Sequence, residues 1–159
     1  QEDAQASLVY PAKAGSIKRN GFIVIRNEPC KVINISTHQD GKHGHAKASF
    51  VALSILSGKR YEDNVQTSHN VSVPFVERNE LTLIDIDEED GFLTLMDDEG
   101  EVREDLTLPH LCSTNTVANM EEMERLSENI QRSFREDATV ILTILKTMGK
   151  EKVIAMHED

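Results

Sequence analysis

The chain has 159 residues, a hydrophobic fraction of 38% and a formal net charge of −11. This length suits one ordinary domain or two small ones. The longest aliphatic run, at residues 140–145, is interrupted by Thr143 and is far too short to cross a bilayer. The composition therefore indicates a soluble globular protein and excludes a membrane-spanning helix.

Charge is distributed unevenly along the chain. Residues 1–74 hold 9 basic and 6 acidic residues, a formal balance of +3, whereas residues 75–159 hold 8 basic and 22 acidic residues, a balance of −14. One interpretation is a cationic part that contacts a polyanion and an acidic part that resists nonspecific binding. The simpler alternative is the uneven surface of an acidic protein.

The first half has the pattern of an all-β domain, and its short strands with brief turns favour a small barrel. We expect a turn at residues 27–29 and another at 57–58. The domain should end at Pro74, because proline cannot donate to a strand ladder and the charge changes sign there. The predicted domains are residues 1–74 and 75–159. The predicted strands are residues 22–25, 30–36, 46–53 and 59–65.

The second half predicts five strands with one helix before the last two, which is the order of an OB-fold. The helix should begin after Thr116 as its N-cap. One apolar stripe is expected along this helix, facing the barrel: Met120, Met123, Leu126, Ile130 and Phe134. The predicted strands are residues 81–86, 92–96, 101–108, 139–145 and 152–156.

Residues 41–47, Gly-Lys-His-Gly-His-Ala-Lys, form a short cationic connection between two predicted strands. Gly41 and Gly44 permit positive φ and keep bulk away, so the connection is suited to presenting Lys42. His43 and His45 lie beside two lysines, which repel metal ions, and an exposed tip provides no dry cavity for acid–base catalysis. A phosphate-binding loop needs an upstream glycine and a following Ser or Thr that this segment lacks. We therefore expect no metal site and no catalytic residue here.

Basic residues are concentrated in residues 11–60, which contain nine basic residues and only two acidic ones. Clustered cations on a small barrel favour contact with an RNA backbone, and the scarcity of aromatic residues disfavours base readout. Scattered solvated lysines are the alternative interpretation. The two cysteines, Cys30 and Cys112, form no C-x-x-C pair, so we expect reduced thiols. The candidate RNA contacts are Lys18, Arg19, Lys47, Lys59, Arg60 and Arg78.

Further motifs accompany residues 41–47: Ser-Thr at 36–37, Arg-Tyr-Glu-Asp at 60–63, Thr-Ser-His-Asn at 67–70, Val-Pro at 73–74 and Gly-Glu-Val-Arg-Glu-Asp at 100–105. Together they resemble the eukaryotic translation initiation factor 5A family over nearly the whole chain, and residues 41–47 are the most specific part. The resemblance implies an SH3-like barrel followed by an OB-fold, a mostly β protein of two small barrels, in agreement with the strand pattern.

The resemblance also implies that Lys42 becomes hypusine. Deoxyhypusine synthase, with NAD as its own cofactor, transfers an aminobutyl group from spermidine, and deoxyhypusine hydroxylase completes the residue. Gly41, His43, Gly44 and His45 would shape the loop or be recognised by these enzymes. The implied protein is cytoplasmic, needs no cofactor of its own and is not an enzyme. It would bind the ribosome and peptidyl-tRNA, relieve stalling such as that at consecutive prolines and assist termination; relatives also self-associate, so a homodimer is an expectation.

The chain departs from the family pattern just before Lys42. Relatives commonly place Ser-Lys-Thr-Gly there, whereas this chain has His-Gln-Asp-Gly at residues 38–41. A lysine that is acetylated in relatives corresponds to Gln39, and Asp40 puts a negative charge two residues from Lys42. The segment at residues 110–115 is also divergent. These changes keep open the alternative of an unmodified, general RNA-binding adaptor.

Overall fold

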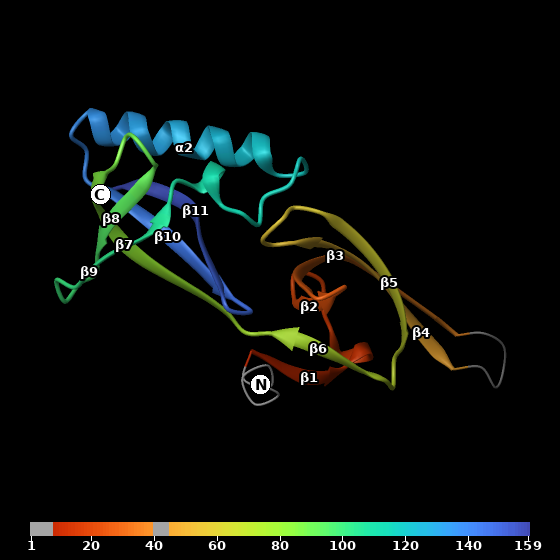
Figure 1. The fold of residues 1–159 in the computed structure, drawn as a ribbon. Helices are drawn as coiled ribbons and strands as arrows, with labels where there is room; N and C mark the ends of the chain where they lie inside the picture. The colour runs from red at the N-terminus through yellow and green to blue at the C-terminus, as the bar shows by residue number, and fades with distance from the viewer. Residues whose placement is uncertain (1–7, 40–44) are drawn as a thin grey trace. The chain divides into compact units, whose positions relative to one another are not determined.

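The computed structural model describes residues 8–39 and 45–159 and divides the chain into Gln1–Phe75 and Val76–Asp159. We call these the N-terminal and the C-terminal unit. Each has its own sheet and its own hydrophobic core, and the described chain is mostly strand, as the sequence predicted (Figure 1). None of the helices in the described part of the chain has the length and apolarity that crossing a bilayer requires.

The N-terminal unit is built from antiparallel strands. Four of them form a sheet in the order β2-β3-β4-β5, and β1 pairs with β6. The strands β1 and β6 were not anticipated, because Pro11 lies within β1 and proline argues against a strand. The elements are β1 (Val9–Lys13), the short 3-10 helix η1 (Ala14–Ser16), β2 (Phe22–Ile25), β3 (Glu28–Gln39), β4 (Ala46–Ser54), β5 (Arg60–Gln66) and β6 (Asn70–Pro74).

The core of the N-terminal unit follows from alternation along its strands. On β4, Ala48, Phe50 and Ala52 are buried while the residues between them are partly exposed. Fully burying a side chain such as Phe50 is worth about 1.5–3 kcal/mol. Cys30 joins this core as a free cysteine, and burial raises the pKa of its thiol to about 11.

The turn expected at residues 27–29 lies one residue earlier in the structure. Arg26 and Asn27 have φ values of 52° and 67°, and β3 already begins at Glu28. A two-residue hairpin turn between twisted strands favours positive φ at both positions, a conformation that asparagine adopts more readily than most residues. Pro29 was therefore misread as part of the turn; it is a buried residue of β3 opposite Val24.

The C-terminal unit has five strands in the order β11-β10-β7-β8-β9, with a helix between the third and fourth strands along the chain. This is the OB-fold order that the sequence predicted. Met148 and Gly149, both at positive φ, form the turn between the last two strands. The elements are β7 (Val76–Ile86), β8 (Phe92–Met96), β9 (Val102–Thr107), the short 3-10 helix η2 (Pro109–Leu111), α2 (Met120–Arg135), β10 (Val140–Thr147) and β11 (Lys150–Glu158).

Helix α2 begins later than expected. Its N-cap position is Asn119, and Thr116 instead shapes the preceding turn, where its Oγ1 accepts a hydrogen bond from the N–H of Ala118 at 3.1 Å. A threonine hydroxyl can cap a turn as well as a helix, and the pattern alone does not separate the two. The predicted stripe is confirmed, since Met123 and Ile130 are buried and its remaining members are half-buried.

Candidate functional site

The candidate site lies at the end of the β3–β4 hairpin (Figure 1). Gln39 pairs with Ala46, and His38 pairs with Lys47, so the strands remain paired up to the stretch that joins them. The predicted site residues Gly41, Lys42, His43 and Gly44 lie outside the described residues, and their roles stay predictions. The described part therefore defines the two strand ends on either side of residues 40–44.

Side chains near this end of the hairpin are solvent-exposed. On β3 every residue from Ser36 to Gln39 is exposed. His45, which directly precedes β4, and Lys47 on β4 are exposed as well. The first core residue of β4 is Ala48, at 1% exposure. The hairpin thus continues beyond the core, held by its strand ladder, which leaves side chains available to a partner.

Strand β5 and the segment after it brace the site. Lys47 pairs with Gln66, and the N–H of Thr67 donates to the carbonyl of Ala46 at 3.0 Å. The carbonyl of Thr67 in turn accepts from the N–H of Gly15 at 3.0 Å. A Cβ at Gly15 would lie 3.1 Å from the Cβ of Thr67, so a larger residue here would have to push Thr67 away by a few tenths of an ångström. No local sequence pattern predicts this brace, because it joins segments that are far apart in the chain.

The predicted RNA contacts Lys59 and Arg60 lie at the opposite end of β4. Leu53 pairs with Arg60, whereas Lys47 pairs with Gln66, so six residues of strand separate these positions, about 20 Å. Arg60 is also paired with Glu62, with Nη1 and Oε2 2.6 Å apart, and both side chains are exposed. The structure therefore divides these cations between two ends of one sheet.

The remaining predicted contacts, Lys18, Arg19 and Arg78, lie outside β3 and β4. Lys18 and Arg19 are exposed in a turn that is closed by a hydrogen bond from the N–H of Gly21 to the carbonyl of Lys18, at 2.9 Å. The N–H of Asn20 donates to the carbonyl of Val32 at 2.8 Å, which holds this turn against the earlier half of β3. Arg78 is exposed on β7 and belongs to the C-terminal unit.

A polar cluster around Glu28 holds the turn that carries Lys59. The Glu28 carboxylate accepts hydrogen bonds from the hydroxyl of Tyr61 and, at 2.7 Å, from that of Ser57. Burial raises the pKa of Glu28, but these hydrogen bonds, with Ser54 and Lys59, outweigh burial and hold it below its usual value. The hydrogen bond between the Tyr61 hydroxyl and the Glu28 carboxylate raises the pKa of Tyr61 to about 12. No local sequence pattern predicts this cluster, since its members come from β3, β4, β5 and the turn between β4 and β5.

Comparisons with known proteins cover both units. The family described as translation initiation factor 5A-like, N-terminal, matches residues 7–69, and the family described as eukaryotic elongation factor 5A hypusine, DNA-binding OB fold, matches residues 75–157. Eukaryotic translation initiation factor 5A of Zea mays is 43% identical over 98% of this chain and 89% of its own length. Factor 5A-1 of Arabidopsis thaliana is 41% identical over 98% of this chain and 90% of its own length.

Solved structures agree with this match. A translation initiation factor 5A family protein from Naegleria fowleri superposes with a TM-score of 0.82 at 39% identity, covering 94% of this chain and 98% of that chain. A factor 5A from Methanococcus jannaschii superposes with a TM-score of 0.66 at 24% identity, covering 94% and 95%, which supports the fold alone. The likeness confirms a mostly β fold with an SH3-like N-terminal part and an OB-fold C-terminal part.

Proposed function

The chain belongs to the eukaryotic translation initiation factor 5A family, and we propose that it is a hypusine-containing factor that binds the ribosome and contacts peptidyl-tRNA. The segment at residues 41–47 carries this proposal. It lies between two strands that remain paired as far as Gln39 and Ala46, and the side chains of Gln39, His45 and Lys47 are exposed. A modified Lys42 on such a base would extend away from the N-terminal core.

In this proposal Lys42 is the substrate of other enzymes, and the chain catalyses nothing itself. Deoxyhypusine synthase would add the aminobutyl group of spermidine, and the hydroxylase would complete hypusine. The exposure of Gln39 before the lysine and of His45 after it supports this, because a modifying enzyme needs access to both flanks of the lysine. The proposed setting is the cytoplasm, where ribosomes and these enzymes meet.

The physical role of hypusine would be positioning. A longer side chain with a second amine places a thin cation against the RNA backbone near the acceptor end of a peptidyl-tRNA. Holding the reactants in a productive arrangement lowers the entropic part of the barrier. Proline is a rigid, hindered reactant, so the benefit should be largest at consecutive prolines, and termination would benefit in the same way.

The mass of the peptide that contains Lys42, taken from protein purified from its native cells, tests this proposal. The expected mass is that of lysine plus an aminobutyl group and a hydroxyl. In a strain that depends on this chain, Lys42→Arg should abolish growth, because arginine keeps the charge but cannot accept the group. Lys150→Arg is the matched control, since it makes the same exchange at an exposed lysine that is not a predicted contact, and it should leave growth unchanged.

A general RNA-binding adaptor that is never modified is the second candidate, and it is favoured by Gln39 and Asp40. These residues differ from those that relatives commonly have before the modified lysine, and Asp40 adds a carboxylate two residues from Lys42 in the sequence. An unmodified lysine in the native peptide, together with normal growth of the Lys42→Arg strain, would establish the adaptor and reject the main proposal.

A further inference from the structure

Two segments that are distant in the sequence lie against the end of the β3–β4 hairpin. The link between β5 and β6 is joined to β4, because the N–H of Thr67 donates to the carbonyl of Ala46 at 3.0 Å. The end of β1 and η1 are joined to the same link, since the N–H of Ala14 donates to the carbonyl of His69 at 2.8 Å. We call the resulting end of the N-terminal unit the hairpin-end surface. It consists of residues 13–16, 36–39, 45–48 and 66–70.

The hairpin-end surface is cationic. It contains two exposed lysines, Lys13 and Lys47, and three of the six histidines of the chain. Asp and Glu make up 28 of the 159 residues, yet none occurs in its four segments. Residues 40–44, which the structure does not describe, hold one aspartate and one lysine and leave the formal balance unchanged. A surface with this charge attracts a polyanion.

The charges of both lysines are available to a partner. The Nζ of Lys13 donates to the carbonyl of Ser68 at 3.1 Å, and this neutral acceptor holds the side chain over the β5–β6 link. Among the described residues, neither Lys13 nor Lys47 forms an ion pair with a carboxylate. An ammonium group has three N–H donors, so one carbonyl leaves donors for a phosphate oxygen.

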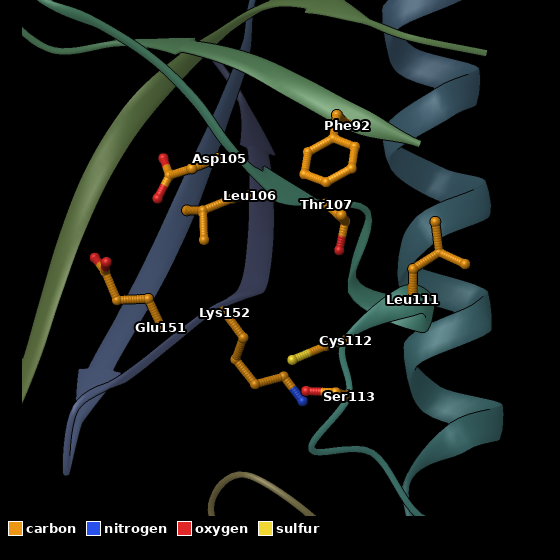
Figure 2. A pocket seen from close by; sticks show the side chains of 9 residues that line it. All are labelled: Phe92, Asp105, Leu106, Thr107, Leu111, Cys112, Ser113, Glu151 and Lys152. Carbon is orange, nitrogen blue, oxygen red and sulfur yellow. The ribbon is translucent and has the colours of Figure 1, made fainter. Parts of the chain in front are cut away.

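Charges near a groove of the C-terminal unit are arranged differently. Figure 2 shows this shallow groove, whose lining includes Asp105, Glu151 and Lys152. Arg103 forms paired hydrogen bonds with both carboxylates, at 2.7 Å to Asp105 and at 3.0 and 2.9 Å to Glu151, and Lys152 is only 3% exposed. The carboxylates are therefore matched within the unit, whereas the lysines of the hairpin-end surface have no such match in the described chain.

The uncharged residues of the hairpin-end surface favour RNA over a protein partner. They are small or polar, and no large aliphatic or aromatic residue occurs among them. Protein interfaces depend on aromatic and other large anchors that fill pockets, whereas phosphate and ribose oxygens accept hydrogen bonds from lysine, hydroxyl and amide groups. Thr37, Ser68 and Asn70 carry such groups and are exposed.

We propose that the hairpin-end surface binds the phosphate backbone of tRNA, with Lys13 and Lys47 each contacting a phosphate. Lys13 was not among the predicted contacts, and only folding brings it to this end of the unit. Lys59 and Arg60 lie at the opposite end of β4 and do not belong to this surface. The assignment rests on the proposed contact with peptidyl-tRNA and adds the residues that meet the RNA backbone.

Fluorescence anisotropy tests this surface with a labelled tRNA transcript and the full chain carrying unmodified Lys42, at several salt concentrations. Lys13→Gln should weaken binding severalfold and reduce the logarithmic salt slope by about 0.7–0.9, because one fewer phosphate is neutralised. Lys13→Gln combined with Lys47→Gln should reduce the slope by about 1.4–1.8. Lys31→Gln is the matched control, since Lys31 is an exposed lysine of β3 that pairs with Leu53, and it should leave the slope unchanged.

The mass of the Lys42 peptide separates RNA binding from modification. In native cells this mass should be the same for Lys13→Gln as for wild type. Equal effects of Lys13→Gln and Lys31→Gln, or no effect of either, would overturn the RNA surface and leave the proposed role of Lys42 intact. An unmodified Lys42 with a selective loss in Lys13→Gln would keep the surface and reject the hypusine proposal.

A contact with the modifying enzyme would give a different result. Lys13→Gln would then lower the transfer of the aminobutyl group to Lys42 and leave tRNA binding unchanged, and the RNA assignment would be wrong. Circular dichroism of each variant verifies folding.

Discussion

The two units share a mostly antiparallel β construction but expose different features to their partners. In the N-terminal unit, the hairpin of β3 and β4 continues past Ala48, and its exposed end carries the predicted modification segment. In the C-terminal unit, β8, β9 and β11 form a shallow groove together with η2 and the segment that follows it. The comparison teaches that the exposed features of each unit lie at strand ends and connections, while the two cores hold the strands that position them.

The largest expected effect concerns the independence of the two cores. Leu142 is fully buried in β10, within a cluster drawn only from the C-terminal unit. Leu142→Ala should destabilise that unit by about 2–5 kcal/mol, because it removes buried methyl groups and leaves a cavity. Differential scanning calorimetry should show one transition moving to lower temperature while the other remains in place.

Ile84→Ala is the matched control for this truncation. Ile84 is on β7 of the same sheet but is an exposed residue, so its loss should move the transition little. If Leu142→Ala shifted both transitions together, the units would unfold as one cooperative body and the comparison between two separate cores would fail.

A smaller loss of stability is expected from breaking the ion pair between the two outer strands of the five-stranded sheet. Arg103 on β9 joins Glu151 on β11, which ties together the two strands at the ends of that order. Arg103→Gln should cost about 1 kcal/mol at neutral pH, because the pairing is bidentate but partly solvated. Arg125→Gln, which breaks an exposed helical pair with Glu121, should cost less.

The pH dependence of this cost gives a sharper measurement. Hydrogen bonds from Arg103 hold the pKa values of Asp105 and Glu151 below their ordinary 3.8 and 4.5. Groups with a lowered pKa stabilise the fold above their unfolded values and lose that contribution as pH falls through the folded values. The difference between wild type and Arg103→Gln should therefore shrink as pH falls below about 4. A constant difference would show that packing, not charge, is responsible.

The strands and their order were largely predictable because alternation is a local signal. The early start of β3 was missed because Pro29 suggested a turn, and the late start of α2 was missed because Thr116 resembled a cap. The hairpin segment was recognisable from its residue types, but the division of the cations depends on strand register. The groove of the C-terminal unit was not predictable, since Phe92 and Leu111 belong to separate elements that line one groove only after folding.

The smallest expected effect separates the two units by their response to salt. Lys47, at the hairpin end, should contact phosphate, whereas Lys150 is an exposed lysine of the acidic unit. Binding of a tRNA transcript, measured against salt concentration, should lose about 0.7–0.9 from its logarithmic slope in Lys47→Ala, because one fewer counterion is released. Lys150→Ala removes the same charge and should leave the slope unchanged. Equal losses would mean that RNA responds to net charge alone, and the assignment of the cationic partner surface to the N-terminal unit would be wrong.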